Sequence, residues 1–98
     1  MEKTSAMSVM SALAQPTRLA VFSMLAASGP EGLTAGELAE RTGTPGNTMS
    51  AHLLILSRAN LASSRRAGRN IFYAAEPDAV RQLAKFLGQV ADGKSQHR

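Results

Sequence analysis

Residues 34–58 read TAGELAERTGTPGNTMSAHLLILSR, and this stretch decides the fold. Thr34 followed by Glu37 matches a capping box, in which the threonine side chain bonds a first-turn amide and the glutamate reaches back. Gly43 is placed to end the short helix that begins there. Thr44-Pro45 then predicts an immediate second start, with threonine as N-cap and proline at the first helical position. Two short helices joined by a glycine-containing turn are typical of a helix-turn-helix unit, expected over residues 34–60.

The second helix, expected over residues 45–58, has two different faces. Met49, Leu53 and Leu56 recur at helical spacing and are expected to pack inward. The outward side of the N-terminal half carries small or hydrogen-bonding side chains, which allow close approach to base edges in a major groove. The residues of this helix expected to contact DNA are Gly46, Asn47, Thr48, Ser50, Ala51 and His52.

The roles expected within this set differ. Asn47 and Ser50 are the candidates for hydrogen bonds to base edges, and Thr48 is the candidate for a phosphate contact. His52 has no ligand-type neighbours, so it is expected to be a scaffold residue or a phosphate neighbour rather than a metal ligand. The alternative interpretation of the whole segment is a purely structural amphipathic helix.

Residues 61–75 predict a β-hairpin directly after the helix-turn-helix unit. Its strands are expected over 62–66 and 69–75, on either side of Ala67-Gly68, and the second strand has β-branched and aromatic content. Such a hairpin is a wing that can lie along the phosphates or the minor groove, although its charges could also be merely solvated. The arginines expected to contact phosphate are Arg65, Arg66 and Arg69.

The charges along the chain support a polyanionic partner. No carboxylate occurs between Glu40 and Glu76, whereas five arginines fall inside that stretch: Arg41, Arg58, Arg65, Arg66 and Arg69. A surface with only positive charge repels itself unless it meets a polyanion, and nucleic-acid phosphate is the usual one. The net charge of +4 agrees with this interpretation.

Amphipathic helices are expected on both sides of this central region. Residues 5–14 predict the first, in which Met7, Met10, Leu13 and Ala14 share one face. A second helix should open at Pro16 and end near Gly29-Pro30 as the buried central helix, with an apolar set of Leu19, Val21, Phe22, Leu25 and Ala26. Residues 78–90 predict the last helix, and residues 92–98 a flexible tail.

The last helix carries an apolar stripe that has no obvious partner in so small a monomer. Leu83, Leu87 and Val90 form this stripe, which we interpret as a dimerisation surface. A domain of 98 residues buries a limited core, and association with a second copy is one common remedy.

Composition excludes several classes of protein. The chain has no cysteine, which removes disulfides, thiolate metal sites and thiol redox sensing. No stretch approaches 18 apolar residues and no signal-like N-terminus occurs, so a cytoplasmic protein without membrane contact is expected. Nucleophile-base spacings, paired carboxylates and phosphate-cradling glycine loops are missing, so neither an enzyme nor a cofactor site is expected.

Four phrases of this sequence resemble the ArsR/SmtB family of winged helix-turn-helix repressors. They are Leu13-Ala14-Gln15-Pro16-Thr17-Arg18-Leu19, Gly36-Glu37-Leu38-Ala39, Asn47-Thr48-Met49-Ser50-Ala51-His52-Leu53 and Gly68-Arg69-Asn70-Ile71-Phe72-Tyr73. Each is weak alone, but their order and spacing are specific and cover about residues 13–87. The resemblance implies a homodimer held by the first and last helices, with Met7 and Met10 beside Leu83, Leu87 and Val90. It also implies repression of a promoter and release by an inducer.

The positions at which members of that family sense metals hold other residues here. Thr34 and Gly36 stand where the best-known site has two cysteines before Glu37-Leu38. The last helix carries Asp78 but no histidine, and His97 lies in the tail. The methionines at 7, 10, 24 and 49 are expected to fill the core. No metal is therefore expected, and the inducer remains open.

The expected fold is mainly α with a small β-hairpin: one winged helix-turn-helix domain over residues 1–98, with about five helices and a two-stranded wing. The expected function is sequence-specific binding of an inverted-repeat operator by a homodimeric repressor. The alternative is a winged-helix protein-interaction module without specific DNA binding.

Overall fold

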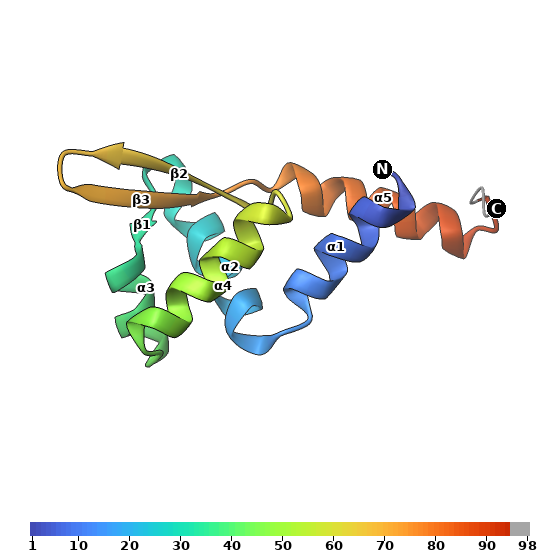
Figure 1. Cartoon of the computed structure of the whole chain (residues 1–98). Coiled ribbons are helices and arrows are strands. Elements are labelled where there is room, and N and C mark those ends of the chain that lie inside the picture. The colour runs from blue at the N-terminus through green and yellow to red at the C-terminus, as the bar shows by residue number, and fades with distance from the viewer. Residues whose placement is uncertain (95–98) are drawn as a thin grey trace.

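A computed structural model describes residues 1–94, and its helix-turn-helix unit lies in the half of the molecule that carries the hairpin (Figure 1). The elements follow in the order α1 (Lys3–Leu13), α2 (Pro16–Ser28), the 3₁₀ turn η1 (Gly29–Glu31), β1 (Leu33–Thr34), α3 (Ala35–Thr42), α4 (Gly46–Arg58), β2 (Ala62–Ala67), β3 (Asn70–Ala75) and α5 (Asp78–Ala91). Five α-helices and a hairpin agree with the expected fold class.

The capping box that starts α3 is present as predicted. The Thr34 amide donates to Glu37 Oε1 at 2.8 Å, and the Glu37 amide donates to Thr34 Oγ1 at 3.1 Å. The first of these bonds, supported by the Thr34 hydroxyl and by the charge of Arg41, holds the pKa of Glu37 below its ordinary value. Gly43 ends the helix in the left-handed region, with φ of 66°.

The hairpin belongs to a three-stranded antiparallel sheet with strand order β1-β3-β2. The two-residue β1 pairs Leu33 with Tyr73, and the hairpin register runs from Ala62 opposite Ala75 to Ala67 opposite Asn70. A backbone this close leaves no room at Gly32, where φ is 75° and an added Cβ would overlap the Tyr73 carbonyl oxygen. The β1 strand was not predicted, so the two-stranded wing is an incomplete description.

The core lies between α1, α2, α3, α4, the base of the hairpin and the first half of α5, and within residues 1–94 its buried residues are all hydrophobic. Met49, Leu53 and Leu56 of α4 are buried as predicted, together with Leu38 of α3. The amphipathic patterns of α3 and α4 therefore point in the predicted direction, which fixes the outward face of α4 as well.

Helices α1 and α5 pack side by side at the end of the molecule opposite the hairpin (Figure 1). The chain is elongated, with extents of 47 × 23 × 19 Å and a radius of gyration of 14.6 Å. A compact domain of this length has a radius of gyration of about 13 Å. The distal half of α5 accounts for much of this difference, because it projects beyond the body (Figure 1).

Several local predictions were wrong. The first helix spans Lys3–Leu13 and buries Ala6, Val9 and Ala12, so Ala14 is outside it and Met7 is 59% exposed rather than in the core. Leu19 is 50% exposed, so α2 is buried on one side only. Met7 and Leu19 follow helical spacing in the sequence, but the neighbouring helices cover a different face of each helix.

Two chain turns also differ from the prediction by one residue. Pro45, and not Thr44, is the N-cap of α4, because the Thr44 amide donates to the Ala39 carbonyl and stays with the preceding turn. In the hairpin, Gly68 and Arg69 form the two-residue turn, so Arg69 precedes β3 instead of opening it. A tight hairpin turn with positive φ at its first residue favours glycine there, and Gly68 has φ of 65°. The predicted tail extends past Lys94, and residues 95–98 lie outside the described residues.

Candidate nucleic-acid interface

The outward face of α4 presents the residues predicted to read DNA. Gly46 is its first residue, and the side chains of Asn47, Thr48, Ser50 and Ala51 are exposed along its N-terminal half. The small side chains of Gly46, Ser50 and Ala51 project little from the helix, so the base edges of a major groove can approach its backbone.

Asn47 has one half of its amide engaged locally. Its Oδ1 accepts a hydrogen bond from the Thr48 amide at 2.9 Å, which leaves the NH₂ group free to donate. A free donor suits acceptors on base edges in the major groove, such as N7 and O6 of guanine, N7 of adenine or O4 of thymine.

One exposed residue on the same face was missed from the sequence. Leu54 is 49% exposed and lies two helical turns from Asn47 and one turn from Ala51. Its helical spacing from Asn47 was the available signal, but no role was predicted for Leu54. The same face ends at Arg58, the last residue of α4, which is also exposed.

The three wing arginines are exposed, but they differ in their contacts and in the face of the hairpin from which they project. Arg65 on β2 donates from Nη2 to the Glu31 carbonyl oxygen at 3.0 Å, and its guanidinium carbon lies 4.9 Å from the centroid of the Phe72 ring. Both partners leave the charge uncancelled, since one is a carbonyl dipole and the other an aromatic face. Arg66 is opposite Ile71 in the register, so its side chain leaves the other face of the hairpin.

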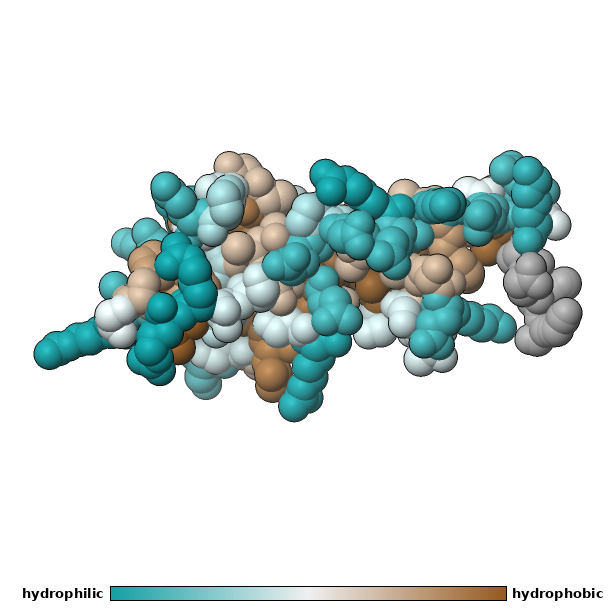
Figure 2. All heavy atoms as spheres, turned by 90° about the horizontal axis from the view of Figure 1, so that it is seen from above, coloured by the Kyte–Doolittle hydropathy of each residue, from teal (hydrophilic) through white to brown (hydrophobic). Residues whose placement is uncertain are grey.

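Figure 2 shows hydrophilic side chains protruding from the end of the molecule that carries the wing, where Arg69 occupies the turn. Within residues 1–94, Arg65 hydrogen-bonds the Glu31 carbonyl and no carboxylate. The wing therefore keeps the positive charge that the sequence predicted for it.

His52 is half-buried at the edge of this surface and contacts a residue far away in the sequence. Arg18 Nη1 of α2 lies 3.2 Å from His52 Nδ1, and Arg18 Nε donates to the Ala12 carbonyl oxygen at 2.7 Å. Arg18 thus joins the Ala12 carbonyl to His52, and its contact with His52 was not predicted.

The residues predicted for dimerisation lie on α1 and α5. Leu87 and Val90 are 41% and 44% exposed, Met7 is also exposed, and Met10 is half-buried. Leu83 is buried against the core of the same subunit, so it anchors α5 rather than offering free surface.

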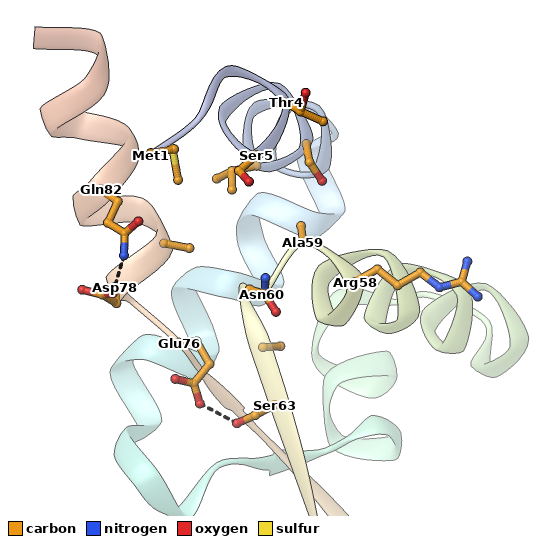
Figure 3. A pocket seen from close by; sticks show the side chains of 14 residues that line it. Met1, Thr4, Ser5, Arg58, Ala59, Asn60, Ser63, Glu76, Asp78 and Gln82 are labelled. Atoms are coloured by element: carbon orange, nitrogen blue, oxygen red, sulfur yellow. Dashed lines mark hydrogen bonds between the residues drawn. The ribbon is translucent and has the colours of Figure 1, made fainter. Parts of the chain in front are cut away.

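A cavity of about 650 Å³ opens beside α1 and α5 (Figure 3). It lies between these helices, the end of α4 at Arg58 to Asn60, and the start of β2. Its two carboxylates already accept hydrogen bonds, from Ser63 Oγ to Glu76 Oε2 and from Gln82 Nε2 to Asp78 Oδ2, each at 2.7 Å. None of the residues predicted to contact DNA or to form the dimer lines this space. Arg58 does line it, but it was not among those predicted residues.

Neither a metal cage nor a membrane-spanning helix is found in the described part of the chain. No three His, Asp or Glu side chains of residues 1–94 gather as a possible metal site. Within the same range no single helix is long and apolar enough to cross a membrane; only α1 and the α2–η1 segment together reach that length, across a 97° bend.

Comparison with protein families matches residues 13–65 to the helix-turn-helix domain family. Among curated proteins, the chain is 36% identical over 83 residues to the nodulation protein NolR of Rhizobium meliloti, a match covering 85% of this chain and 63% of NolR. It is 42% identical over 71 residues to the transcriptional regulator KmtR of Mycobacterium tuberculosis, covering 72% of this chain and 52% of KmtR. It is 33% identical over 85 residues to the transcriptional regulator YgaV of Escherichia coli, covering 87% and 84%.

Solved structures give the same result. An ArsR-like transcriptional regulator from Rhodococcus superposes with a TM-score of 0.81 at 26% identity, covering 92% of this chain and 82% of that one. The homodimeric winged helix-turn-helix domain of Mb0332 from Mycobacterium bovis, a possible ArsR-family regulator, has a TM-score of 0.71 at 29% identity, with coverages of 96% and 83%.

The match spans 63% of the length of NolR and 52% of the length of KmtR, but 84% of the length of YgaV. The helix-turn-helix match covers more than half of the chain, and the order of helices, the wing and the similar regulators agree. The chain therefore belongs to the ArsR-type family of winged helix-turn-helix transcriptional regulators.

Proposed function

We propose that this chain acts as a homodimeric, sequence-specific DNA-binding repressor that leaves its operator when an inducer binds. The observation that carries the proposal is the outward face of α4, which exposes Asn47, Ser50 and Ala51 beside a wing with three arginines. The names of the similar proteins support the same function, since KmtR and YgaV are transcriptional regulators.

Base readout is assigned to the first two turns of α4. The free NH₂ of Asn47 donates to a purine N7 or to a carbonyl oxygen on a base edge, and Ser50 can donate or accept. Leu54 adds an apolar contact of the kind that the thymine methyl group offers. On this proposal, the preferred half-site has base acceptors where Asn47 and Ser50 reach it. It has a thymine where Leu54 reaches it.

Phosphate contacts are assigned to the wing and to the flank of α4. Arg66 and Arg69 are exposed, Arg65 is oriented by the Glu31 carbonyl and Phe72, and Thr48 and His52 flank the base-reading residues. If each subunit neutralises about four phosphates, the dimer has a salt slope near −7, since each contact contributes about 0.9.

The dimer is assigned to the apolar surface of α1 and α5. Met7, Leu87 and Val90 are exposed there, and the similar domain of Mb0332 is homodimeric. A twofold axis at this end places two copies of α4 on the same side of a duplex. The operator is then an inverted repeat, with half-sites about 10 bp or a multiple apart.

The inducer and the compartment belong to the same proposal. We place the protein in the cytoplasm, where bacterial-type operators are accessible. A thiolate-bound metal is an unsuitable inducer for this chain, because its sequence has no cysteine.

The test is selection of bound duplexes from a random pool at low ionic strength. An inverted repeat should be enriched, and its affinity should fall steeply with salt. The selection is repeated with candidate metals and small apolar molecules, and a compound that releases the enriched duplex identifies the inducer. Enrichment of no sequence, with weak binding to every duplex, would contradict the proposal.

A further inference from the structure

The turn between α1 and α2 leaves one carbonyl without a helical partner. The carbonyl of Ala12 would normally accept from the amide four residues later, but residue 16 is proline and has no N–H. Arg18 supplies the missing donor, with Nε 2.7 Å from the Ala12 oxygen. The Arg18 backbone is fixed as well, because its amide donates to Gln15 Oε1 at 2.8 Å.

The guanidinium held in this way faces His52. Arg18 Nη1 lies 3.2 Å from His52 Nδ1, which joins α2 to the reading helix α4 across 34 residues of sequence. A guanidinium has donors only and stays protonated, so Nδ1 must be the acceptor of this bond. A neutral imidazole whose Nδ1 accepts carries its single proton on Nε2.

The Nε2–H group points away from Arg18, since the two ring nitrogens lie on opposite sides of the ring. His52 is half-buried, and one turn before it on the same flank of α4 lies the exposed Thr48. Both side chains can therefore donate to the same stretch of phosphate backbone when the N-terminal half of α4 enters a groove.

We propose that Arg18 is a positioning residue that locks His52 in the Nε2–H tautomer and thereby prepares a neutral hydrogen-bond donor for a DNA phosphate. This inference rests on the proposed DNA binding and adds a residue on α2 that does not itself touch DNA. The same contact ties α4 to the last turn of α1, so the reading helix and the proposed dimer helix share one anchor.

The salt dependence of DNA binding distinguishes a neutral donor from the arginines of the wing. Arg66 and Arg69 release counterions when they meet phosphate, so their loss flattens the salt dependence. His52 adds a hydrogen bond without a charge. Its loss should lower the affinity and leave the salt slope unchanged.

The test uses two substitutions that keep different halves of the imidazole. His52→Gln places an amide NH₂ near the position of Nε2 and loses the acceptor that faces Arg18. His52→Asn places an amide oxygen near Nδ1 and loses the outer donor. We expect His52→Asn to weaken binding of the selected duplex about tenfold per subunit, the scale of one lost hydrogen bond to a charged group, while His52→Gln stays within about threefold per subunit.

The role of Arg18 is tested by introducing Arg18→Met into the wild type and into the His52→Gln variant. Arg18→Met should weaken binding in the wild-type background by much more than in the His52→Gln background, where no Nδ1 remains to be oriented. A loss of the same factor in both backgrounds would show that Arg18 only supports the fold. The His52 pair leaves Arg18 in place, so it remains informative even where Arg18→Met does not fold.

Nitrogen-15 NMR of the free wild-type protein at alkaline pH tests the tautomer without DNA. The chain has two histidines, and a His97→Asn variant assigns their signals. Proton attachment at Nε2 of His52 is expected, and attachment at Nδ1 overturns the inference. If the tautomer is as expected but both His52 variants bind DNA like wild type, the inference fails while the proposed function stands. If no duplex is bound by the wild type, the proposed function fails first.

Discussion

On the proposed function, base discrimination depends most directly on Asn47, because its amide oxygen is occupied and its NH₂ group is free. We expect Asn47→Ala to relax the preference at one or two base pairs of each half-site by about 1–3 kcal/mol, with little change at the others. Competition binding with single-base operator variants measures this. A uniform loss at every position would instead assign Asn47 to phosphate contact.

Arg66 tests the electrostatic part of the interface, since it is exposed and on the hairpin face opposite Arg65. Arg66→Ala should weaken binding of specific and random duplexes alike and reduce the salt slope by about 0.9 per subunit. The matched control is Lys85→Ala on α5, which removes one exposed charge far from the wing. An unchanged slope for Arg66→Ala would remove this arginine from the DNA contacts.

At the level of single residues, the sequence predicts type and exposure better than partners. The outward positions of Asn47, Ser50 and Ala51 follow from helical period once the apolar face is known. The partners of Arg18 and Arg65 lie 34 positions away along the chain, at His52 and Glu31. Contacts of that separation depend on how the helices cross, which no local pattern specifies.

The capping box stabilises helix α3, and this stabilisation is expected to weaken as the pH falls. The pKa of Glu37 is lowered in the fold, chiefly by the bond from the Thr34 amide, so its contribution to stability is present above its ordinary value of 4.5. That contribution is lost as the pH falls through the lower folded value. Thermal unfolding of Glu37→Gln should therefore differ from wild type most at neutral pH, and the two curves should converge in acid.

Thr34→Ala removes the other half of the box, and its expected cost is about 1 kcal/mol. Chemical unfolding at neutral pH measures it, and wild-type stability in this variant would show that the α3 N-terminus is held by its neighbours alone.

The β1–β3 pairing depends on Gly32, which lies against the Tyr73 carbonyl with a positive φ. Gly32→Ala should lower the free energy of unfolding by about 1–3 kcal/mol, because the new methyl group forces the strands apart and strains the backbone. Gly88→Ala is the matched control. It lies in α5 with nothing within 4 Å, so it should be neutral or raise stability by about 0.5–1 kcal/mol.

Elements with strong local signals were predictable and short ones were not. The capping box, Pro16 and Gly43 mark the limits of α2 and α3 because each meets a backbone requirement of its own. Strand β1 has two residues and exists because β3 lies beside it, so its sequence carries no alternation. The N-cap of α4 moved to Pro45 because the Thr44 amide bonds the α3 carbonyl of Ala39, a contact between elements.

The whole molecule has an apolar end that a second copy would cover. Leu87→Glu places a carboxylate on the α5 surface and should produce monomers with weak operator binding, measured by sedimentation and by duplex titration. Gln89→Glu is the control, because it introduces the same group at an exposed position two residues further along α5. A Leu87→Glu protein that sediments as a dimer would move the interface elsewhere.

The corner between α1 and α2, where the axes of α1 and the α2–η1 segment meet at 97°, lies where Gln15 is extended before Pro16 and Ala12 has no helical amide partner. Replacing Pro16 by alanine would return that amide and let both segments join into a single straight rod. The first helix would then swing away from its own subunit and could be exchanged with a neighbour's. We therefore expect Pro16→Ala to make the protein prone to exchanging this segment between copies.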